Sequence, residues 1–417
     1  MRSQTTRETR ALGLLRRRPE VRALSRIARR HGVGAWIVGG AVRDASLGVP
    51  VPEIDVAVTG EAEELARDLE REGAGRAVFL SRGRPGPRVF RVAGRRPIDI
   101  AEIEGGSIAA DLARRDFTVN AIAVDLQTGR VLDPFGGLRD LAHRRLRCVD
   151  PRNLLEDPLR ALRAARLLAT HSLRPDPETR AASRRARAGL RKVAAERVAG
   201  ELSRLLGSIA AAPALSWAAG AGILTAALGL RVSDTRARQA ARALRTLDDH
   251  ATGRLPPPQR RRLRLALLAW RLSLSPRQTR RWLGERRWAR QEAEEASRLM
   301  VLADAARTIE QRRNAWQWIL EAGPLAPDAL RLLVRQYPHQ KARASRLLRL
   351  ARLPVKRVAV TGSDLLAWLG IRPGPAVGAL LSQLRLQAAM GAVRNRREAR
   401  NWLSGQVQKA PFTGYNL

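Results

Sequence analysis

The chain has 417 residues, 45% of them hydrophobic, and a formal net charge of +38. The length is enough for two to four domains with a buried core, and the hydrophobic content excludes a largely disordered chain. The excess of positive charge favours a polyanionic partner such as a nucleic acid. Because 73 of the 77 basic residues are arginines, genome composition is an alternative source of this charge.

The sequence also argues against disulfides, a cysteine-based metal centre, a signal peptide and a membrane span. A single cysteine, Cys148, excludes an internal disulfide and a cysteine-based metal centre. The N-terminus lacks the apolar core of a signal peptide. The uncharged stretch 208–230 is long enough to span a bilayer, but Pro213 and its many Ala and Gly residues favour a buried helix-turn-helix. We therefore expect a cytoplasmic protein without a membrane span.

The pattern of apolar residues changes along the chain. The first 145 residues predict a mixed α/β head, with a helix at 61–72 whose first turn is acidic. From residue 153 almost to the end, Leu and Ala recur at helical spacing, which predicts an all-helical remainder of an α+β protein. Short apolar runs bounded by Gly, Pro or charged residues predict strands at 35–40, 53–60, 76–81, 88–94, 97–103, 117–126 and 130–135.

The stretch WIVGGAVRDASLGVPVPEIDVAV, residues 36–58, combines a glycine turn with two spaced carboxylates. Gly39 and Gly40 end a strand and open a helix, where backbone N–H groups favour an anion, and Arg43 adds a phosphate ligand. Glu53 and Asp55 lie two residues apart, so a strand places both on one face. Carboxylates beside substrate phosphates are typical of Mg²⁺ chemistry, in which two ions activate a hydroxyl and stabilise the leaving pyrophosphate. A tight turn and an exposed strand face are the alternatives.

A second cluster lies in residues 111–141. Arg115, Asp116 and Asn120 provide donors and acceptors suited to a ribose and a triphosphate. A surface salt bridge is the alternative interpretation of the Arg-Arg-Asp sequence.

A third cluster lies in LLEDPLRALRAARLLA, residues 154–169. If this stretch is one helix, Asp157, Arg160, Arg163 and Arg166 follow one another at three-residue steps on a drifting face. A carboxylate that accepts from an amino group, beside a guanidinium that donates to a ring nitrogen, fits cytosine and adenine. Uracil and guanine would leave buried groups unpaired, at about 1–3 kcal/mol each. An ion pair on a helix surface is the alternative.

Five motifs in this order, VGGAVRD, EIDVAV, RRDFTVNAIAVD, DPFGG and EDPLRALRAARL, resemble those of class II tRNA nucleotidyltransferases. This bacterial-type family of CCA-adding enzymes shares a superfamily with bacterial poly(A) polymerases. The resemblance covers residues 34–206, and the segment 361–384 is similar to the tail of long bacterial members. It implies a polymerase-β-like nucleotidyltransferase head, followed by a helical neck, body and tail.

The resemblance implies addition of C, C and A to the tRNA 3′ end from CTP and ATP, without a nucleic-acid template. It implies that the body and tail bind the acceptor and T arms of tRNA, and no protein partner is expected. The implied domains are an N-terminal helical extension 1–33, a head 34–147, a neck 148–206, a body 207–355 and a tail 356–417. The implied nucleotide ligands are Gly39, Gly40, Arg43, Arg115, Asp116, Asn120, Asp157, Arg160, Arg163 and Arg166, with two Mg²⁺ ions on Glu53 and Asp55.

Two departures from the family leave alternatives open. Glu53 replaces the usual aspartate of an Asp-x-Asp metal motif, and Asp99 is a candidate third metal ligand. The segment between Asp55 and Arg114 is short and lacks the family's usual Thr-x-Arg-x-Glu run, and a shortened loop here accompanies family members that stop after CC. Addition of only CC or only A is therefore an alternative to full CCA addition. Poly(A) synthesis is a further alternative because poly(A) polymerases share the head motifs, and Glu53 leaves open a catalytically weak RNA-binding protein that kept the fold.

Overall fold

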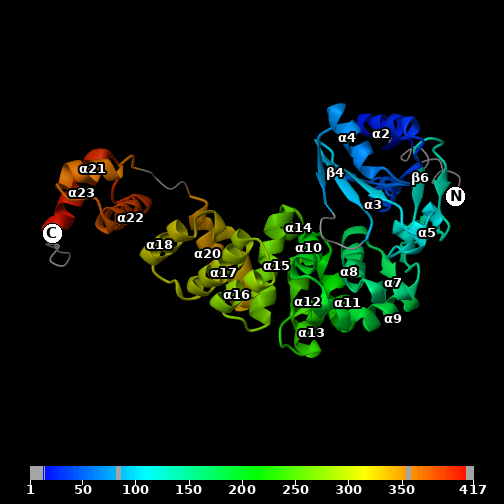
Figure 1. Cartoon of the computed structure of the whole chain (residues 1–417). Coiled ribbons are helices and arrows are strands. Elements are labelled where there is room, and N and C mark those ends of the chain that lie inside the picture. Colours follow the sequence, from blue (N-terminus) through cyan, green and yellow to red (C-terminus); the bar gives the residue numbers. More distant parts are fainter. Residues whose placement is uncertain (1–12, 14, 81–85, 354–357, 410–417) are drawn as a thin grey trace. The chain divides into compact units, whose positions relative to one another are not determined.

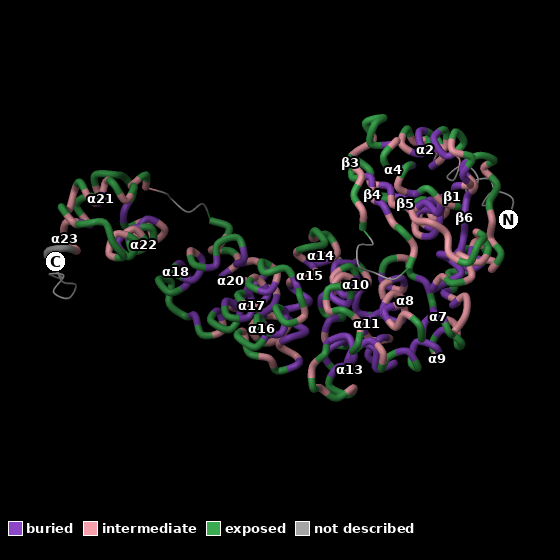
Figure 2. Tube along the Cα trace, viewed as in Figure 1, coloured by how far each residue is buried: buried purple, intermediate pink, exposed green. Residues whose placement is uncertain are grey.

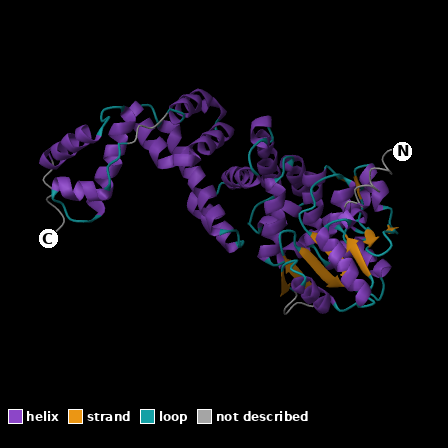
Figure 3. Ribbon diagram, turned by 90° about the horizontal axis from the view of Figure 1, so that it is seen from above, coloured by secondary structure: helices purple, strands orange, loops and turns teal. Residues whose placement is uncertain are grey.

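The computed structural model describes residues 13, 15–80, 86–353 and 358–409, so parts of the predicted N-terminal extension and tail lie outside the described residues. It divides into two compact units, Met1–Asp248 and Asp249–Leu417. The strands are confined to the first part of the chain and the rest is helical (Figures 1 and 3), which confirms the predicted α+β class.

A seven-stranded mixed sheet with the order β3-β4-β5-β2-β1-β6-β7 forms the head. Its strands are β1 Ala35–Val38, β2 Ile54–Val58, β3 Arg76–Phe79, β4 Val89–Ala93, β5 Ile98–Glu102, β6 Ala123–Asp125 and β7 Val131–Leu132. Each predicted apolar run contributes one strand. In the run 117–126 the strand is much shorter than predicted, because the first half of the run forms a 3-10 turn, η1 Thr118–Asn120, before β6 begins.

The helices of the head are α2 Pro19–Arg30, α3 Gly40–Ser46, α4 Ala62–Arg71, α5 Ile108–Ala113 and α6 Gly137–Ala142. Helix α4 packs against β3, β4 and β5, and α2 packs against α4. Alternate side chains of β2 and β5, such as Ile54 and Ile98, are buried on one face of the sheet. Asp55 follows Ile54 in β2 and Asp99 follows Ile98 in β5, so both lie on the opposite face, where the candidate site forms.

Helices dominate the rest of the first unit. The elements are β8 Arg145–Leu146, α7 Pro151–Glu156, α8 Leu159–His171, β9 Arg174–Pro175, α9 Pro177–Ala186, η2 Arg187–Lys192, α10 Ala195–Gly207, α11 Ala211–Gly220, α12 Ile223–Leu228, α13 Asp234–Ala243 and η3 Leu244–Leu247. Buried residues concentrate in the sheet and along α8 and α11 (Figure 2). The parallel pair β8–β9 was not predicted, because two-residue strands leave no periodic signal.

The predicted helix-turn-helix at 208–230 is confirmed as α11 and α12, whose alanines and leucines are mostly buried. None of the helices in the described part of the chain is long and apolar enough to cross a membrane.

The second unit is entirely helical in its described residues. Its elements are α14 His250–Gly253, α15 Pro257–Arg271, α16 Pro276–Glu285, α17 Arg290–Ala305, η4 Ala306–Thr308, α18 Arg312–Ala322, η5 Gly323–Leu325, α19 Ala326–Gln336, η6 Pro338–Gln340, α20 Lys341–Ala351, α21 Gly362–Leu369, α22 Pro375–Met390 and α23 Arg396–Lys409. Helices α21, α22 and α23 share a small core of their own, built on Leu365, Leu384 and Leu403.

Candidate nucleotidyltransferase site

Two carboxylates meet on the open face of the sheet. Strands β2 and β5 pair in parallel with Asp55 directly opposite Asp99. Side chains on a strand alternate between faces, so both carboxylates leave the face covered by α4. Glu53 precedes the first residue of β2 and its side chain is 55% exposed, so it belongs to the edge of this face rather than to the strand.

Arg91 organises these carboxylates. It faces Asp99 across the antiparallel β4–β5 pair, and its Nε and Nη2 lie 2.6 and 2.7 Å from the two oxygens of Asp99. The same Nη2 donates to Glu53 Oε2 at 3.3 Å. One guanidinium thus bridges the first and third acidic residues of the group, and it leaves Asp55 without such a partner.

Burial, followed by the nearby charges of Asp99 and Glu53, raises the pKa of Asp55 to about 6. Arg115 and Arg91 oppose this rise without cancelling it. Asp55 is thus a buried carboxyl group beside two other carboxylates, and a bound cation would stabilise its charged form. Hard oxygen donors of this kind suit Mg²⁺. Among the described residues, however, no group of three or more acidic, His or Cys side chains is arranged for a metal ion.

The glycine turn lies beside this face. Gly39 has a φ of +70° between β1 and α3, and a side chain there would meet Arg115 Nη1 at 2.7 Å. The left-handed backbone conformation favours glycine, and a side chain here would also displace the end of Arg115. Arg43, one turn into α3, is buried, and its donors contact Asp44 Oδ1 at 2.7–2.8 Å and Asn120 Oδ1 at 2.6 Å.

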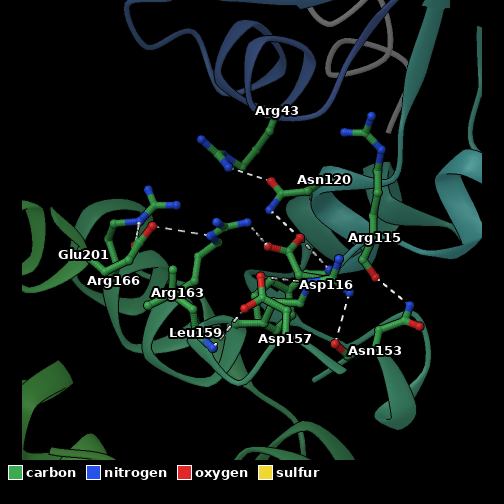
Figure 4. Close-up of polar contacts among 12 residues, drawn as sticks. Arg43, Arg115, Asp116, Asn120, Asn153, Asp157, Leu159, Arg163, Arg166 and Glu201 are labelled. Atoms are coloured by element: carbon green, nitrogen blue, oxygen red, sulfur yellow. Dashed lines mark hydrogen bonds and ion pairs between the residues drawn. The ribbon is translucent and has the colours of Figure 1, made fainter. Parts of the chain in front are cut away.

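A chain of polar contacts continues from Asn120 into the neck (Figure 4). Asn120 Nδ2 donates to Asp116 Oδ1 at 2.9 Å, and Arg163 Nη1 donates to Asp116 Oδ2 at 2.9 Å. Burial alone would raise the pKa of Asp116, but the Arg163 charge and these hydrogen bonds outweigh it and lower the pKa to about 2. Asp116 is therefore a buried carboxylate ion that joins η1 of the head region to α8.

Glu201 of α10 ends this chain of contacts. Its carboxylate is 5% exposed and lies 3.4 Å from Arg163 Nε and 2.6 Å from Arg166 Nε. Figure 4 shows the side chains of Arg163 and Arg166 meeting at this carboxylate. Arg204 also lies 3.5 Å from Glu201, so one carboxylate serves three arginines, of which Arg163 has Asp116 as a second partner. Sequence reasoning missed Glu201, although a lone acidic residue within the apolar repeat ELSRLL was a signal for it.

Asp157 departs from the expected helix face. It terminates α7 in an extended conformation, and α8 begins only at Leu159, so the four residues 157, 160, 163 and 166 do not share one helix. Pro158 gives the physical reason, since a residue before proline is disfavoured in the helical region. Asp157 Oδ2 accepts from Arg197 at 2.8 Å, whereas Arg160 Nε lies 4.0 Å away.

A further contact joins the start of the head to the end of α8. His171 Nε2 lies 2.9 Å from Asp44 Oδ1, and Asp44 also holds Arg43. Burial lowers the pKa of His171. Predicted residues of three sequence clusters are thus brought into one network, in which Arg43, Asn120, Asp116, Arg163 and Arg166 are linked, while Asp157 and Arg160 lie at its edge.

Comparison with known proteins supports one family. Residues 35–103 and 92–147 match the model described as Poly A polymerase head domain, and residues 258–401 match the model described as tRNA nucleotidyltransferase domain 2. The chain is 32% identical, over 93% of its length and 95% of the relative, to the CC-adding tRNA nucleotidyltransferase of Geobacter sulfurreducens. The chain belongs to the tRNA nucleotidyltransferases.

The relatives include both CC-adding and CCA-adding enzymes. The chain is 30% identical, over 89% of its length and 92% of the relative, to the CCA-adding enzyme of Geobacillus stearothermophilus. Among solved structures, the Bacillus stearothermophilus CCA-adding enzyme in complex with CTP aligns with a TM-score of 0.71 and 27% identity, over 94% of this chain and 98% of that one. The resemblance inferred from the five motifs is confirmed.

Proposed function

We propose that this tRNA nucleotidyltransferase adds C, C and A to the 3′ end of tRNA from CTP and ATP, in the cytoplasm and without a nucleic-acid template. The observation that carries the proposal is the pair of carboxylates Asp55 and Asp99 on one face of the sheet, beside the glycine turn, in which Arg91 pairs with Asp99 while Asp55 has no ion pair among the described residues. The matched relatives named CCA-adding enzymes support the product.

In this proposal Asp55, with Glu53 and Asp99, holds Mg²⁺ ions at the open face of the sheet. When bound, such ions lower the pKa of an attacking hydroxyl and offset charge on the departing pyrophosphate. Arg91 keeps the Glu53 and Asp99 carboxylates together before the ions bind.

The nucleotide ligands divide by exposure. Arg115 and Arg163 are 25% and 30% exposed, so their guanidiniums are available to the ribose and the phosphates. Arg43 is buried and acts on the nucleotide by fixing Asn120. Asp157 and Arg160 are partly exposed at the edge of the network, and we assign base selection to them, in line with the pairing that cytosine and adenine allow.

The body and tail, residues 207–355 and 356–417, are proposed to hold the acceptor and T arms of tRNA through phosphate contacts, which position a nucleic acid without reading its sequence. The proposed division into extension, head, neck, body and tail keeps the residue ranges that the family resemblance implies.

The experiment uses three tRNA transcripts that end at the discriminator base, after one C and after two Cs. Each is incubated with the protein, Mg²⁺ and CTP, ATP or both, and the products are resolved to single nucleotides. Growth by C, C and A followed by a stop is expected. A halt at CC on every substrate would replace the proposal with CC addition, and long A tails would replace it with poly(A) synthesis. Asp55→Asn provides the inactive control.

A further inference from the structure

The parallel pair β8–β9 places like charges side by side on the surface of the first unit. Arg145 pairs in register with Arg174, and both side chains are exposed. Like charges directly opposite one another on neighbouring strands are destabilising. Neither side chain forms an ion pair among the described residues, so a bound anion would relieve the repulsion between them.

A cavity of about 430 Å³ lies beside this pair, and Arg144 and Arg180 also line it. Arg144 Nη1 donates to the carbonyl of His171 at 3.0 Å, and Arg180 Nε donates to the carbonyl of Pro175 at 2.9 Å. Backbone carbonyls orient a guanidinium without neutralising it. The cavity is therefore lined by four oriented or exposed arginines that keep their charge.

Only one carboxylate lines the same cavity. Asp176 lies at the N-terminus of α9, where its Oδ1 accepts from the backbone N–H of Thr179 at 2.8 Å. None of the four arginines is within ion-pair distance of it, or of any other carboxylate in the described residues. His143 also lines the cavity and carries no negative charge.

The positive surface continues along α9. Arg180 and Arg184 are separated by one helical turn and lie on the same face. Arg184 lines a second cavity of about 430 Å³, together with Arg185 and Arg187. Of these three, only Arg187 approaches a carboxylate, Asp234, at 3.9 Å.

Arginines elsewhere in the same unit are arranged differently. On α2 and α4, Arg26, Arg67 and Arg71 each form an ion pair with an acidic residue of the head. The β8–β9 arginine surface, defined as Arg144, Arg145, Arg174, Arg180 and Arg184, differs from these three in having no ion pair among the described residues, and its members line two cavities. Guanidiniums bind phosphate oxygens by paired hydrogen bonds, so their natural ligand is a phosphate group.

We propose that the β8–β9 arginine surface binds the sugar–phosphate backbone of the tRNA substrate. Two adjoining cavities joined by a row of arginines fit an extended polyanion, whereas a single phosphate would occupy only one of them. The inference rests on the proposed function, which supplies the RNA. It adds a phosphate-binding surface outside the body and tail, and this surface contacts neither the reacting atoms nor the base.

The test compares two triple variants with equal loss of charge. The first is Arg145→Gln, Arg174→Gln and Arg184→Gln, three exposed side chains that form no hydrogen bond among the described residues. The matched control is Arg22→Gln, Arg29→Gln and Arg76→Gln, three exposed side chains of α2 and β3 that likewise form no hydrogen bond or ion pair among the described residues. Binding of tRNA that lacks CCA is measured by fluorescence anisotropy from 50 to 300 mM salt, and CTP incorporation is measured on the same preparations.

The β8–β9 variant is expected to bind tRNA roughly 10–100-fold more weakly than the control at 0.15 M salt. The slope of log K against log[salt] should fall by about 2–3, because each phosphate contact contributes about 0.9. The KM for CTP, and kcat at saturating tRNA, should match the control. Equal affinity and equal slope in the two variants would overturn the proposal.

Two further outcomes separate the possible failures. If the wild-type protein binds tRNA but incorporates no nucleotide, the proposed function fails while the reduced slope of the β8–β9 variant still supports the surface. If the variant loses binding of long-chain inorganic polyphosphate, used as a probe, while its tRNA affinity equals that of the control, the ligand is a phosphate polymer other than RNA and the proposal is wrong.

Discussion

Replacing Asp55 by asparagine is expected to stabilise the fold of the metal-free protein while abolishing nucleotide incorporation. Asp55 is held near Asp99 and Glu53 on the open face of the sheet, and burial together with these charges raises its pKa to about 6 from an ordinary value of 3.8. A charge kept in such surroundings costs folding free energy. Asparagine has nearly the same shape and carries no charge, so it removes this cost.

The sign and size follow from proton linkage. Between about pH 4 and 6 the unfolded chain has released the proton that folded Asp55 still holds, so the wild-type protein loses stability as the pH rises through this window. A rise from 3.8 to about 6, at about 1.4 kcal/mol per pKa unit, corresponds to about 3 kcal/mol above pH 6. Below pH 4 the difference between the two proteins vanishes. For a unit of this size the gain is roughly 6–12 °C in melting temperature.

The assay is thermal melting of wild type and Asp55→Asn in EDTA at pH 4, 5, 6 and 8, with Glu53→Gln as the control. The control removes a charge from a half-exposed side chain nearby, so its gain should be much smaller. Added Mg²⁺ should stabilise the wild type and narrow the difference. A variant that is less stable than wild type at pH 8, or a difference that does not depend on pH, would refute the reasoning.

Four other variants test the site. Glu201→Gln removes a buried negative charge that Arg163 and Arg166 share and should cost about 3–5 kcal/mol in unfolding experiments; an unchanged melting temperature would contradict this role of Glu201. Gly39→Ala forces a side chain into the left-handed region and against a guanidinium, so the KM for CTP should rise several-fold in steady-state kinetics. Joint replacement of Asp157 and Arg160 by alanine should lower the kcat/KM preference for CTP over UTP, and retained selectivity would move base selection elsewhere. Glu53→Asp should keep or raise incorporation, and complete loss would show that the longer side chain is required here.

Local pattern in the sequence was sufficient for much of the fold. The runs that contain β1, β2 and β5 follow the rule that short apolar segments between turns form strands, and each formed one. Asp55 was placed on a strand face by alternation alone, and Gly39 at a turn by its backbone freedom. The extended conformation of Asp157 was also encoded locally, by the proline that follows it, although the helical spacing of the arginines masked it.

Contacts between distant segments were decided only by the tertiary structure. Asp55 and Asp99 are neighbours because β2 and β5 pair in parallel, and Arg91 joins them through the register of β4. Glu201 contacts Arg163 because α10 packs on α8. The sequence by itself determined which residue types line each element, through periodicity and turn chemistry. Strand register and helix packing determined which of these residues contact one another. The pairing of strands and helices is selected by burial of the apolar surface of the whole domain, which no local pattern specifies.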